Sequence, residues 1–164
     1  MTELGVGEVR VRAATPGDVP AILQFAKDLA AYEREPEAVV ATEADIEGAL
    51  FGARPVAEAL IAEIGGKAEG FAIFYTSFST WTGKPGFWLD DLYVNPAARG
   101  SGAGTALLKA IAALAVERGY ARFEWWVLDW NTPSIGFYRA MGARAMDEWT
   151  VYRLDGEALA AAAR

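Results

Sequence analysis

The chain has 164 residues, of which 53% are apolar and 23% charged, and this composition excludes a disordered or fibrous protein. It contains neither cysteine nor histidine, which excludes disulfides, thiolate metal sites, a cysteine nucleophile, Ser-His-Asp hydrolases and zinc deaminases. The formal net charge of −7 disfavours nucleic acid as a partner and mildly favours cationic amines.

The chain carries no membrane or export signal that we can identify. A membrane-spanning helix needs about 18 or more apolar residues in a row, and no run approaches this length. Residues 1–5 lack the basic and apolar regions of a signal peptide. We therefore expect a soluble cytoplasmic protein, with no membrane partner, that forms one domain over residues 1–164.

The first part of the chain reads as one strand followed by two helices. Alternation predicts a strand over residues 9–12, and a turn at residues 15–18 leads into a helix over residues 19–33. The apolar face of this helix comprises Ile22, Phe25, Ala26, Leu29 and Ala30. After a loop at residues 34–37, a second helix over residues 42–51 opens with a Thr-x-x-Asp capping pattern.

The middle of the chain reads as three strands and a helix. Aromatic and β-branched residues predict a hairpin of strands 56–64 and 69–78, joined by a Gly-Gly-Lys turn. A loop at residues 79–85 precedes a strand over residues 86–94. A helix over residues 105–118 follows, and its core-facing side chains are Leu107, Leu108, Ile111, Leu114 and Ala115.

The last part of the chain reads as a mixture of short elements. We expect a buried strand over residues 121–128, a helix over residues 134–141, closing strands over residues 143–146 and 148–154, and a terminal helix over residues 155–164. The chain shows no linker and no internal repeat. This order of strands and helices predicts a single mixed α/β domain.

A glycine-rich turn, Arg99-Gly100-Ser101-Gly102-Ala103-Gly104, joins the third of these middle strands to its helix. Its backbone N–H groups are bare at a helix N-terminus, where the helix dipole favours an anion. The turn lacks the lysine of a P-loop and has Thr105 where a dinucleotide fingerprint needs glycine. We expect an anionic cofactor, while the alternative is that the glycines serve only tight turning and close packing.

The Arg-Gly-x-Gly-x-Gly turn resembles the coenzyme A pyrophosphate loop of the GCN5-related N-acetyltransferases. Residues 131–143 resemble the Asn-x-x-x-x-x-Phe-Tyr-x-x-x-Gly-Ala motif of the same superfamily. Residues 30–33, 78–84, 89–94 and 129–131 resemble its diamine (spermidine/spermine or thialysine) acetyltransferase branch. The resemblance covers nearly the whole chain and implies a single-domain acyl-CoA N-acyltransferase fold, with a mixed, mostly antiparallel central sheet flanked by helices.

The resemblance implies acetyl-CoA as the co-substrate, with its pantetheine arm between a splayed fourth and fifth strand. Backbone N–H groups in this region would bind the thioester carbonyl, and the turn would bind the phosphates. The implied cofactor-binding residues are Leu92, Tyr93, Val94, Arg99, Gly100, Ser101, Gly102, Ala103, Gly104, Asn131, Ser134 and Tyr138, with Arg139 as a further candidate. Asn131 has the alternative of a helix-entry turn, and Arg139 that of a solvated surface residue.

Three residues are implied in the chemistry. An alkylamine has a pKa near ~10.4 and arrives protonated, so its proton must be removed before it attacks. By resemblance, Asp90 helps to remove this proton through water, Asp91 holds the amine or a second ammonium group, and Tyr138 protonates the departing thiolate. A β-bulge, frequent here in the family, would let both aspartates avoid opposite-face alternation. The alternatives are that an aspartate caps a turn or pairs with an arginine, and that Tyr138 only packs.

The acceptor is less well defined. Glu33, Glu35 and Trp81 are candidates for the mouth of the acceptor site, although each has the alternative of an ordinary surface residue. Ser79 stands where polyamine enzymes have an aspartate, and residues 148–152 lack their Glu-Gly-Trp pattern. Fewer anionic groups hold a long polycation less firmly, so a smaller amine such as thialysine is favoured as an alternative.

The leading interpretation is a small-molecule amine N-acetyltransferase that works by direct attack in a ternary complex, because no cysteine or activated serine supports an acetyl-enzyme. Two alternatives stay open: a peptide or ribosomal-protein N-terminal acetyltransferase, and an acyl-CoA-binding regulator without turnover. We expect no metal, since an Asp90-Asp91 pair without further clustered ligands is a poor metal site. By resemblance we also expect a homodimer.

Overall fold

The computed structural model describes residues 8–164, so the expectation about a signal peptide in residues 1–5 lies outside the described residues. The chain divides into two compact units, Met1–Leu128 and Asp129–Arg164, and each is described by itself. The first unit contains the strands β1 (Val9–Ala13), β2 (Glu58–Ile64), β3 (Lys67–Ser79), β4 (Lys84–Val94) and β5 (Phe123–Glu124). Its helices are α1 (Val19–Tyr32), α2 (Glu43–Phe51) and α3 (Ala103–Glu117), with short 3-10 turns at Pro16–Asp18 and Pro96–Ala98.

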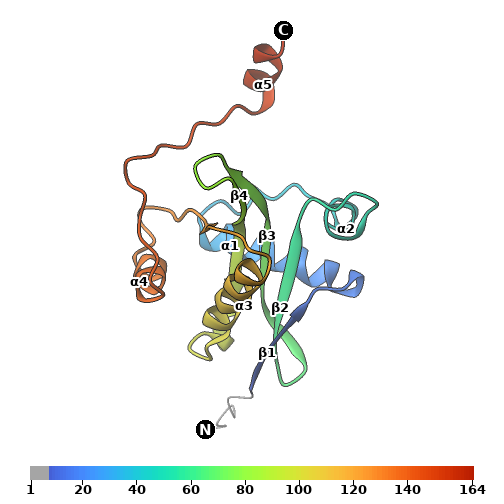
Figure 1. The fold of residues 1–164 in the computed structure, drawn as a ribbon. Helices are drawn as coiled ribbons and strands as arrows, with labels where there is room; N and C mark the ends of the chain where they lie inside the picture. The colour runs from blue at the N-terminus through green and yellow to red at the C-terminus, as the bar shows by residue number, and fades with distance from the viewer. Residues whose placement is uncertain (1–7) are drawn as a thin grey trace. The chain divides into compact units, whose positions relative to one another are not determined.

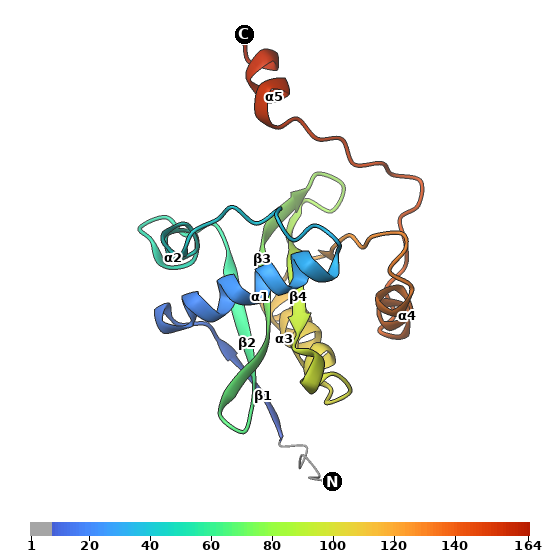
Figure 2. The ribbon, with the colours of Figure 1, turned by 180° about the vertical axis from the view of Figure 1, so that it is seen from behind.

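The strands form one sheet in the order β1-β2-β3-β4-β5. Strands β1 to β4 pair antiparallel with their neighbours, and β5 pairs parallel with β4. Helix α3 lies in front of the sheet in Figure 1 and α1 lies in front of it in Figure 2, so the two helices cover opposite faces. This arrangement confirms the predicted mixed, mostly antiparallel sheet flanked by helices.

Aromatic side chains fill the layers between the sheet and these helices. On the α1 face, Phe25 stacks on Phe71 with ring centroids 5.6 Å apart, and both side chains are almost fully buried. On the α3 face, Phe74 meets Phe87 edge to face at 4.9 Å. The predicted apolar faces of both helices therefore turn inward, as burial of apolar surface requires. Helix α2 begins with the predicted capping box, in which Thr42 and Asp45 exchange hydrogen bonds of 2.8 and 3.2 Å.

An ion-pair network joins strand β1 to strand β2 and to the 3-10 turn at Pro16–Asp18. The Arg12 guanidinium donates to both carboxylate oxygens of Asp18, at 2.7 and 2.9 Å, and to Glu63 at 2.6 Å. The Thr15 N–H also donates to Asp18 at 2.7 Å. These donors lower the pKa of Asp18 from 3.8 to about 2, with the Arg12 hydrogen bonds as the main cause.

This lowered pKa predicts a loss of stability in acid. Asp18 stabilises the folded protein above its unfolded pKa, and this contribution of roughly 2 kcal/mol disappears as the pH falls from about 4 to about 2. Asp18→Asn should remove that part of the pH dependence. Urea unfolding at pH 7 and pH 3 measures the effect, with the exposed Asp147→Asn as a matched control. Equal losses of stability in the native protein and Asp18→Asn would contradict the assignment.

Three of the predicted strands are wrong in extent or do not form. The expected strand over residues 121–128 is reduced to Phe123–Glu124, because it pairs with β4 only at Phe87 and Trp88 and then leaves the ladder. The close approach of this pairing is visible at Gly86, where an added Cβ would lie 2.7 Å from the Arg122 carbonyl oxygen. The two closing strands over residues 143–146 and 148–154 do not form in the described structure. A strand requires a hydrogen-bonded neighbour, and alternation alone does not supply one.

The second unit contains α4 (Thr132–Ala140) and α5 (Gly156–Ala162). Helix α4 begins two residues earlier than predicted, because the Asn131 side chain accepts a hydrogen bond from the Ser134 N–H at 3.4 Å and caps it. The predicted terminal helix is present as α5. Among residues 8–164, no helix combines the length and the apolar character needed to span a bilayer.

Candidate active site

Strand β4 carries its two aspartates at a β-bulge. Ile73 of β3 pairs with Asp91 and the next residue, Phe74, pairs with Leu89, so Asp90 is the extra residue on β4. A bulge re-aims side chains that would otherwise alternate between the two faces of a sheet. The bulge implied by the family resemblance is therefore present, and it lies at the two predicted carboxylates.

Three carboxylates gather around this bulge. Burial, followed by the nearby charges of Asp90 and Glu33, raises the pKa of Asp91 from 3.8 to about 7. Burial of the carboxyl group also raises the pKa of Asp90. The residue as a whole is exposed, but protein atoms surround its carboxyl group and hinder its hydration. The pKa of Glu33 is raised first by burial and second by the charge of Asp90. The predicted residues Glu33, Asp90 and Asp91 thus form one electrostatically coupled cluster.

Glu33 is placed by the turn that ends α1. The Glu35 N–H donates to the Ala30 carbonyl oxygen at 2.8 Å and the Arg34 N–H donates to that of Ala31 at 3.1 Å, which is a Schellman motif. Arg34 occupies the left-handed position of this motif with φ 66°, where glycine is the usual residue. Such a conformation costs a side-chain-bearing residue about 1–2 kcal/mol. The tight turn therefore holds Glu33 at the end of the helix next to the bulge.

Tyr75 is a neighbour of the cluster that the sequence interpretation missed. It lies on β3, and its pKa is raised by burial and by the charge of Asp90. Its partner in the ladder is Trp88, two residues before Asp90. The short predicted loop between the strands over residues 69–78 and 86–94 contained the signal, because a short connection favours antiparallel pairing, which brings these positions together.

Beyond the bulge, the outer edge of β4 is open for other hydrogen bonds. The Asn95 N–H, one residue after β4, donates to the carbonyl oxygen of Glu69 in β3. Because alternate N–H groups of a strand point to opposite sides, the Tyr93 N–H points to β3, and those of Leu92 and Val94 point away from it. Strand β5 pairs only with Phe87 and Trp88, so it separates from β4 before this point, as expected for a splay. Of the three predicted backbone donors, the geometry favours Leu92 and Val94.

The glycine turn is shaped to receive an anion. Gly100 and Gly102 have φ values of 83° and 89°, and nothing lies within 4 Å of a Cβ placed on either residue. Gly102 is the N-cap of α3, and it offers no side-chain cap. The first turn of α3 contains no acidic residue, whereas the first turn of α2 contains Glu43 and Asp45. The Ala103 N–H donates to the Ser101 hydroxyl at 3.3 Å, a long hydrogen bond, and the first turn of the helix presents its N–H groups and open space to a phosphate.

Other predicted residues of the first unit have different surroundings. The guanidinium of Arg99 lies over the rings of Tyr32 and Tyr93, at 5.4 and 5.9 Å from their centroids. Trp81 lies in the turn between β3 and β4, and it is 78% exposed. Glu35 is exposed and ends the Schellman turn. Neither Trp81 nor Glu35 is among the groups that shift the pKa values of the carboxylates.

The remaining predicted residues belong to the second unit. Asn131 is 6% exposed and caps α4, so the helix-entry role considered for it is present. Tyr138 lies on α4 with its ring 5.5 Å from that of Phe137. Arg139 is exposed in the last turn of the same helix. The roles of these residues, and of Ser134, in cofactor binding and catalysis stay predictions.

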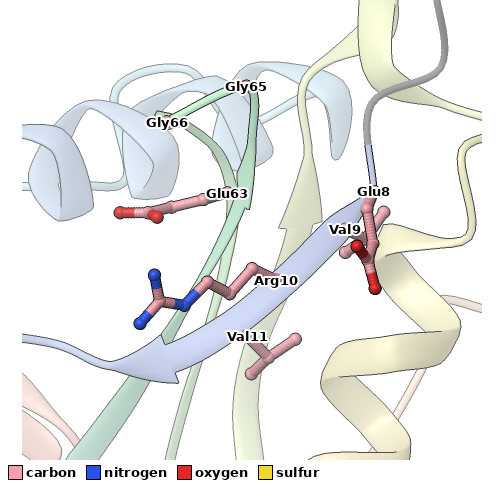
Figure 3. Close-up of a pocket in the computed structure, with 7 residues that line it drawn as sticks. All are labelled: Glu8, Val9, Arg10, Val11, Glu63, Gly65 and Gly66. Atoms are coloured by element: carbon pink, nitrogen blue, oxygen red, sulfur yellow. The ribbon is translucent and has the colours of Figure 1, made fainter.

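Two hollows of the first unit lie apart from the carboxylates. One, of about 540 Å³, runs along the edge strand β1 beside the Gly65-Gly66 turn, with Arg10 and Glu63 on its wall (Figure 3). The other, of about 600 Å³, lies between α3, β1 and β2. Neither contains Asp90 or Asp91, so the site is assigned by its chemistry and not by cavity size. Within residues 8–164, no group of three or more His, Cys, Asp or Glu side chains is arranged to hold a metal ion.

Comparison with known proteins agrees with this geometry. The family model of the acetyltransferase (GNAT) family matches residues 21–143. A thialysine N-epsilon-acetyltransferase from Sus scrofa is 34% identical, over 94% of this chain and 96% of the relative. An L-ornithine N5-acetyltransferase from Arabidopsis thaliana is 30% identical, over 93% of this chain and 86% of the relative.

Solved structures show the same fold. An integron cassette protein from V. cholerae matches with a TM-score of 0.79 and 25% identity, over 95% of this chain and 98% of that protein. A ribosomal-protein-alanine N-acetyltransferase from Brucella melitensis biovar Abortus 2308 matches with a TM-score of 0.71 and 25% identity, over 91% of this chain and 100% of that protein.

The chain belongs to the acetyltransferase (GNAT) family. It is an acetyl-CoA-dependent N-acetyltransferase. Its sequence is similar to the diamine branch of the family, as the motifs predicted.

Proposed function

We propose that this enzyme acetylates a primary amine of a short diamine or a thialysine-like amino acid, by direct attack in a ternary complex. The observation that carries the proposal is the coupled cluster of Asp91, Asp90 and Glu33 at the bulge of β4. Carboxylates in a poorly hydrated site attract an ammonium group and provide a base for its proton. The names of the thialysine relatives support an acceptor of this size.

We assign the proton transfer to the aspartate pair, with Asp91 as the principal acceptor. A general base works best when its pKa lies near the working pH, and the pKa of Asp91 is about 7. The resemblance had implied the opposite division of roles, with Asp90 as the base. Asp90 is the more exposed of the two, so in our proposal it and Glu33 attract the second charged group of the acceptor.

The remaining groups complete the reaction. The N–H groups of Leu92 and Val94 stabilise negative charge on the thioester oxygen as the amine nitrogen attacks the acetyl carbon. The carbon–sulfur bond then breaks, and Tyr138 donates its phenolic proton to the departing thiolate. The phosphates bind at Gly100 to Gly104. Asn131 and Ser134, with Arg139 as a further candidate, complete the predicted cofactor contacts through their matching motif positions.

Gly102→Val tests the cofactor part of the proposal. Valine is strained at φ 89° and fills the open space in front of the turn, so we expect the affinity for coenzyme A to fall by about tenfold or more. Isothermal titration with coenzyme A measures the effect, and Gly66→Val is a matched control with φ 77° outside the proposed site. Unchanged coenzyme A binding by a folded Gly102→Val protein would rule out the turn as the phosphate site.

The function as a whole is tested by the release of free coenzyme A from acetyl-CoA in the presence of different amines. A thiol reagent follows this reaction without background, because the enzyme has no cysteine. The panel contains short diamines, thialysine, ornithine, spermidine, aminoglycosides and short peptides. We expect the fastest turnover with a short diamine or thialysine. No turnover with any of the small amines would refute the proposal.

One observation favours a second candidate, an N-terminal acetyltransferase of a ribosomal protein. The structural match to the Brucella enzyme is at 25% identity and covers all of that protein. Acetylation of the peptides in the panel but of no small amine would support it. The family model runs from the first compact unit into the second, ending at residue 143, which supports one domain over residues 1–164. The homodimer and the cytoplasmic location stay predictions from the sequence.

A further inference from the structure

The guanidinium of Arg99 lies close to two tyrosine rings that differ in their exposure to solvent. Tyr93 is 8% exposed and packs against Phe25 in the core, with ring centroids 6.0 Å apart. Tyr32 is 38% exposed and is the last residue of α1. The Arg99 guanidinium carbon is 5.9 Å from the centroid of Tyr93 and 5.4 Å from that of Tyr32. Arg99 therefore connects the fixed core of the sheet to the end of α1 by cation–π contacts.

The two ends of this connection lie next to the two regions that bind substrates. Arg99 immediately precedes Gly100 of the glycine turn, and its Nε donates to the Val94 carbonyl oxygen at 3.4 Å. Tyr32 immediately precedes Glu33, whose charge acts on Asp91. A guanidinium that stacks through its flat face keeps N–H groups at its edge for an anion. The same side chain is thus able to contact a phosphate and a tyrosine ring at once.

We propose that the contact between Tyr32 and Arg99 couples the binding of the two substrates, with both residues as positioning residues. This inference rests on the proposed function, since it requires coenzyme A phosphates at the glycine turn. A phosphate there restrains Arg99, Arg99 restrains Tyr32, and Glu33 is then ordered before the amine arrives. The amine pays less of the ordering entropy, so its affinity rises. Linkage requires the amine to raise the affinity for coenzyme A by the same factor.

The coupling is measured by titrating thialysine into the enzyme with and without saturating coenzyme A, which lacks the acetyl group and prevents turnover. We expect coenzyme A to tighten thialysine binding about two- to fivefold, the factor that corresponds to one exposed cation–π contact. Tyr32→Leu should abolish this coupling, so it should weaken thialysine binding in the presence of coenzyme A and, by linkage, coenzyme A binding in the presence of thialysine by the same factor. The affinity of the amine-free enzyme for coenzyme A should stay unchanged. Tyr32→Phe keeps the ring and should keep the coupling.

A second variant and a control complete the design. Arg99→Lys keeps the positive charge at the turn but removes the flat stacking group, so it should also lose the coupling. Tyr152→Leu makes the same replacement as Tyr32→Leu at an exposed tyrosine and should behave as the native enzyme.

Equal coupling in the native enzyme, Tyr32→Leu and Arg99→Lys would overturn the inference while turnover still supports the proposed function. Absence of both coenzyme A binding and turnover in the native enzyme would overturn the two together.

Discussion

Asp91→Asn is expected to lower kcat by about 10²–10³-fold, the usual contribution of a general base, while coenzyme A binding stays within twofold of native. The amide cannot accept the proton of the ammonium group. Steady-state kinetics with the best amine of the panel and titration with coenzyme A measure the two quantities. Asp147→Asn, at an exposed position of the second unit, is the matched control and should leave both unchanged.

The pH profile separates loss of a base from loss of packing. Asp91 must be deprotonated to act, and its pKa is about 7, so kcat/KM of the native enzyme should rise with pH and bend near 7. That bend should disappear in Asp91→Asn. A variant that keeps native kcat, or keeps the bend near pH 7, would show that Asp91 is not the base.

The same replacement should make the protein more stable at neutral pH. The folded pKa of Asp91 lies above its unfolded value of 3.8, so the unfolded chain ionises first and the native protein loses stability as the pH rises from about 4 to about 7. Asparagine carries no charge and removes this penalty. Thermal unfolding at pH 8 should therefore give a higher Tm for Asp91→Asn than for the native protein, which distinguishes a disabled site from a damaged fold.

Tyr138→Phe is expected to lower kcat by about 10–10²-fold, less than the full contribution of a general acid, because a thiolate is a fair leaving group without protonation. For the same reason the deficit should narrow as the pH approaches 9. Stopped assays of coenzyme A release across pH 6 to 9 measure both effects. Tyr152→Phe is the matched control.

The stability of Tyr138→Phe shows whether a loss of activity comes from the missing hydroxyl or from lost packing. The Tyr138 ring lies 5.5 Å from that of Phe137, and phenylalanine preserves that contact. Tyr138→Phe should therefore unfold at the native temperature. Native kcat throughout the pH range would show that Tyr138 only packs, which is the alternative that the sequence left open.

Local patterns predicted most of the first unit. Alternation and turn signals marked β1 to β4, and successive antiparallel strands with short connections become neighbours in a sheet. The capping box at Thr42 and the apolar face of α3 were equally local features. The errors came at the end of the chain, where residues 121–128 and 148–154 have strand-like composition but lack a continuous ladder in the structure. Composition indicates a preference for strands, whereas pairing depends on a partner far away in the sequence.

Some features of the candidate site were visible in local sequence motifs, and others arise only from contacts between separate elements. The motifs pointed to Asp90, Asp91 and the glycine turn, because their signal is contiguous in the sequence. The part played by Tyr75 and the stacking of Arg99 on Tyr32 were not visible there. Each of those contacts joins residues from separate elements, and no spacing along the chain encodes them.

The amino-acid sequence by itself determined the class of this protein and singled out the glycine turn and the two aspartates as candidates for anion binding and proton transfer. Its lack of cysteine and histidine excluded other chemistries. Only the tertiary structure decided that Asp91 titrates near neutrality beside Asp90 and Glu33, and that the N–H groups of Leu92 and Val94 face the open edge of β4. The physical reason is that residue types and local conformational propensities are properties of the sequence itself. Desolvation, charge coupling and strand pairing depend on distances between segments, and folding alone sets those distances.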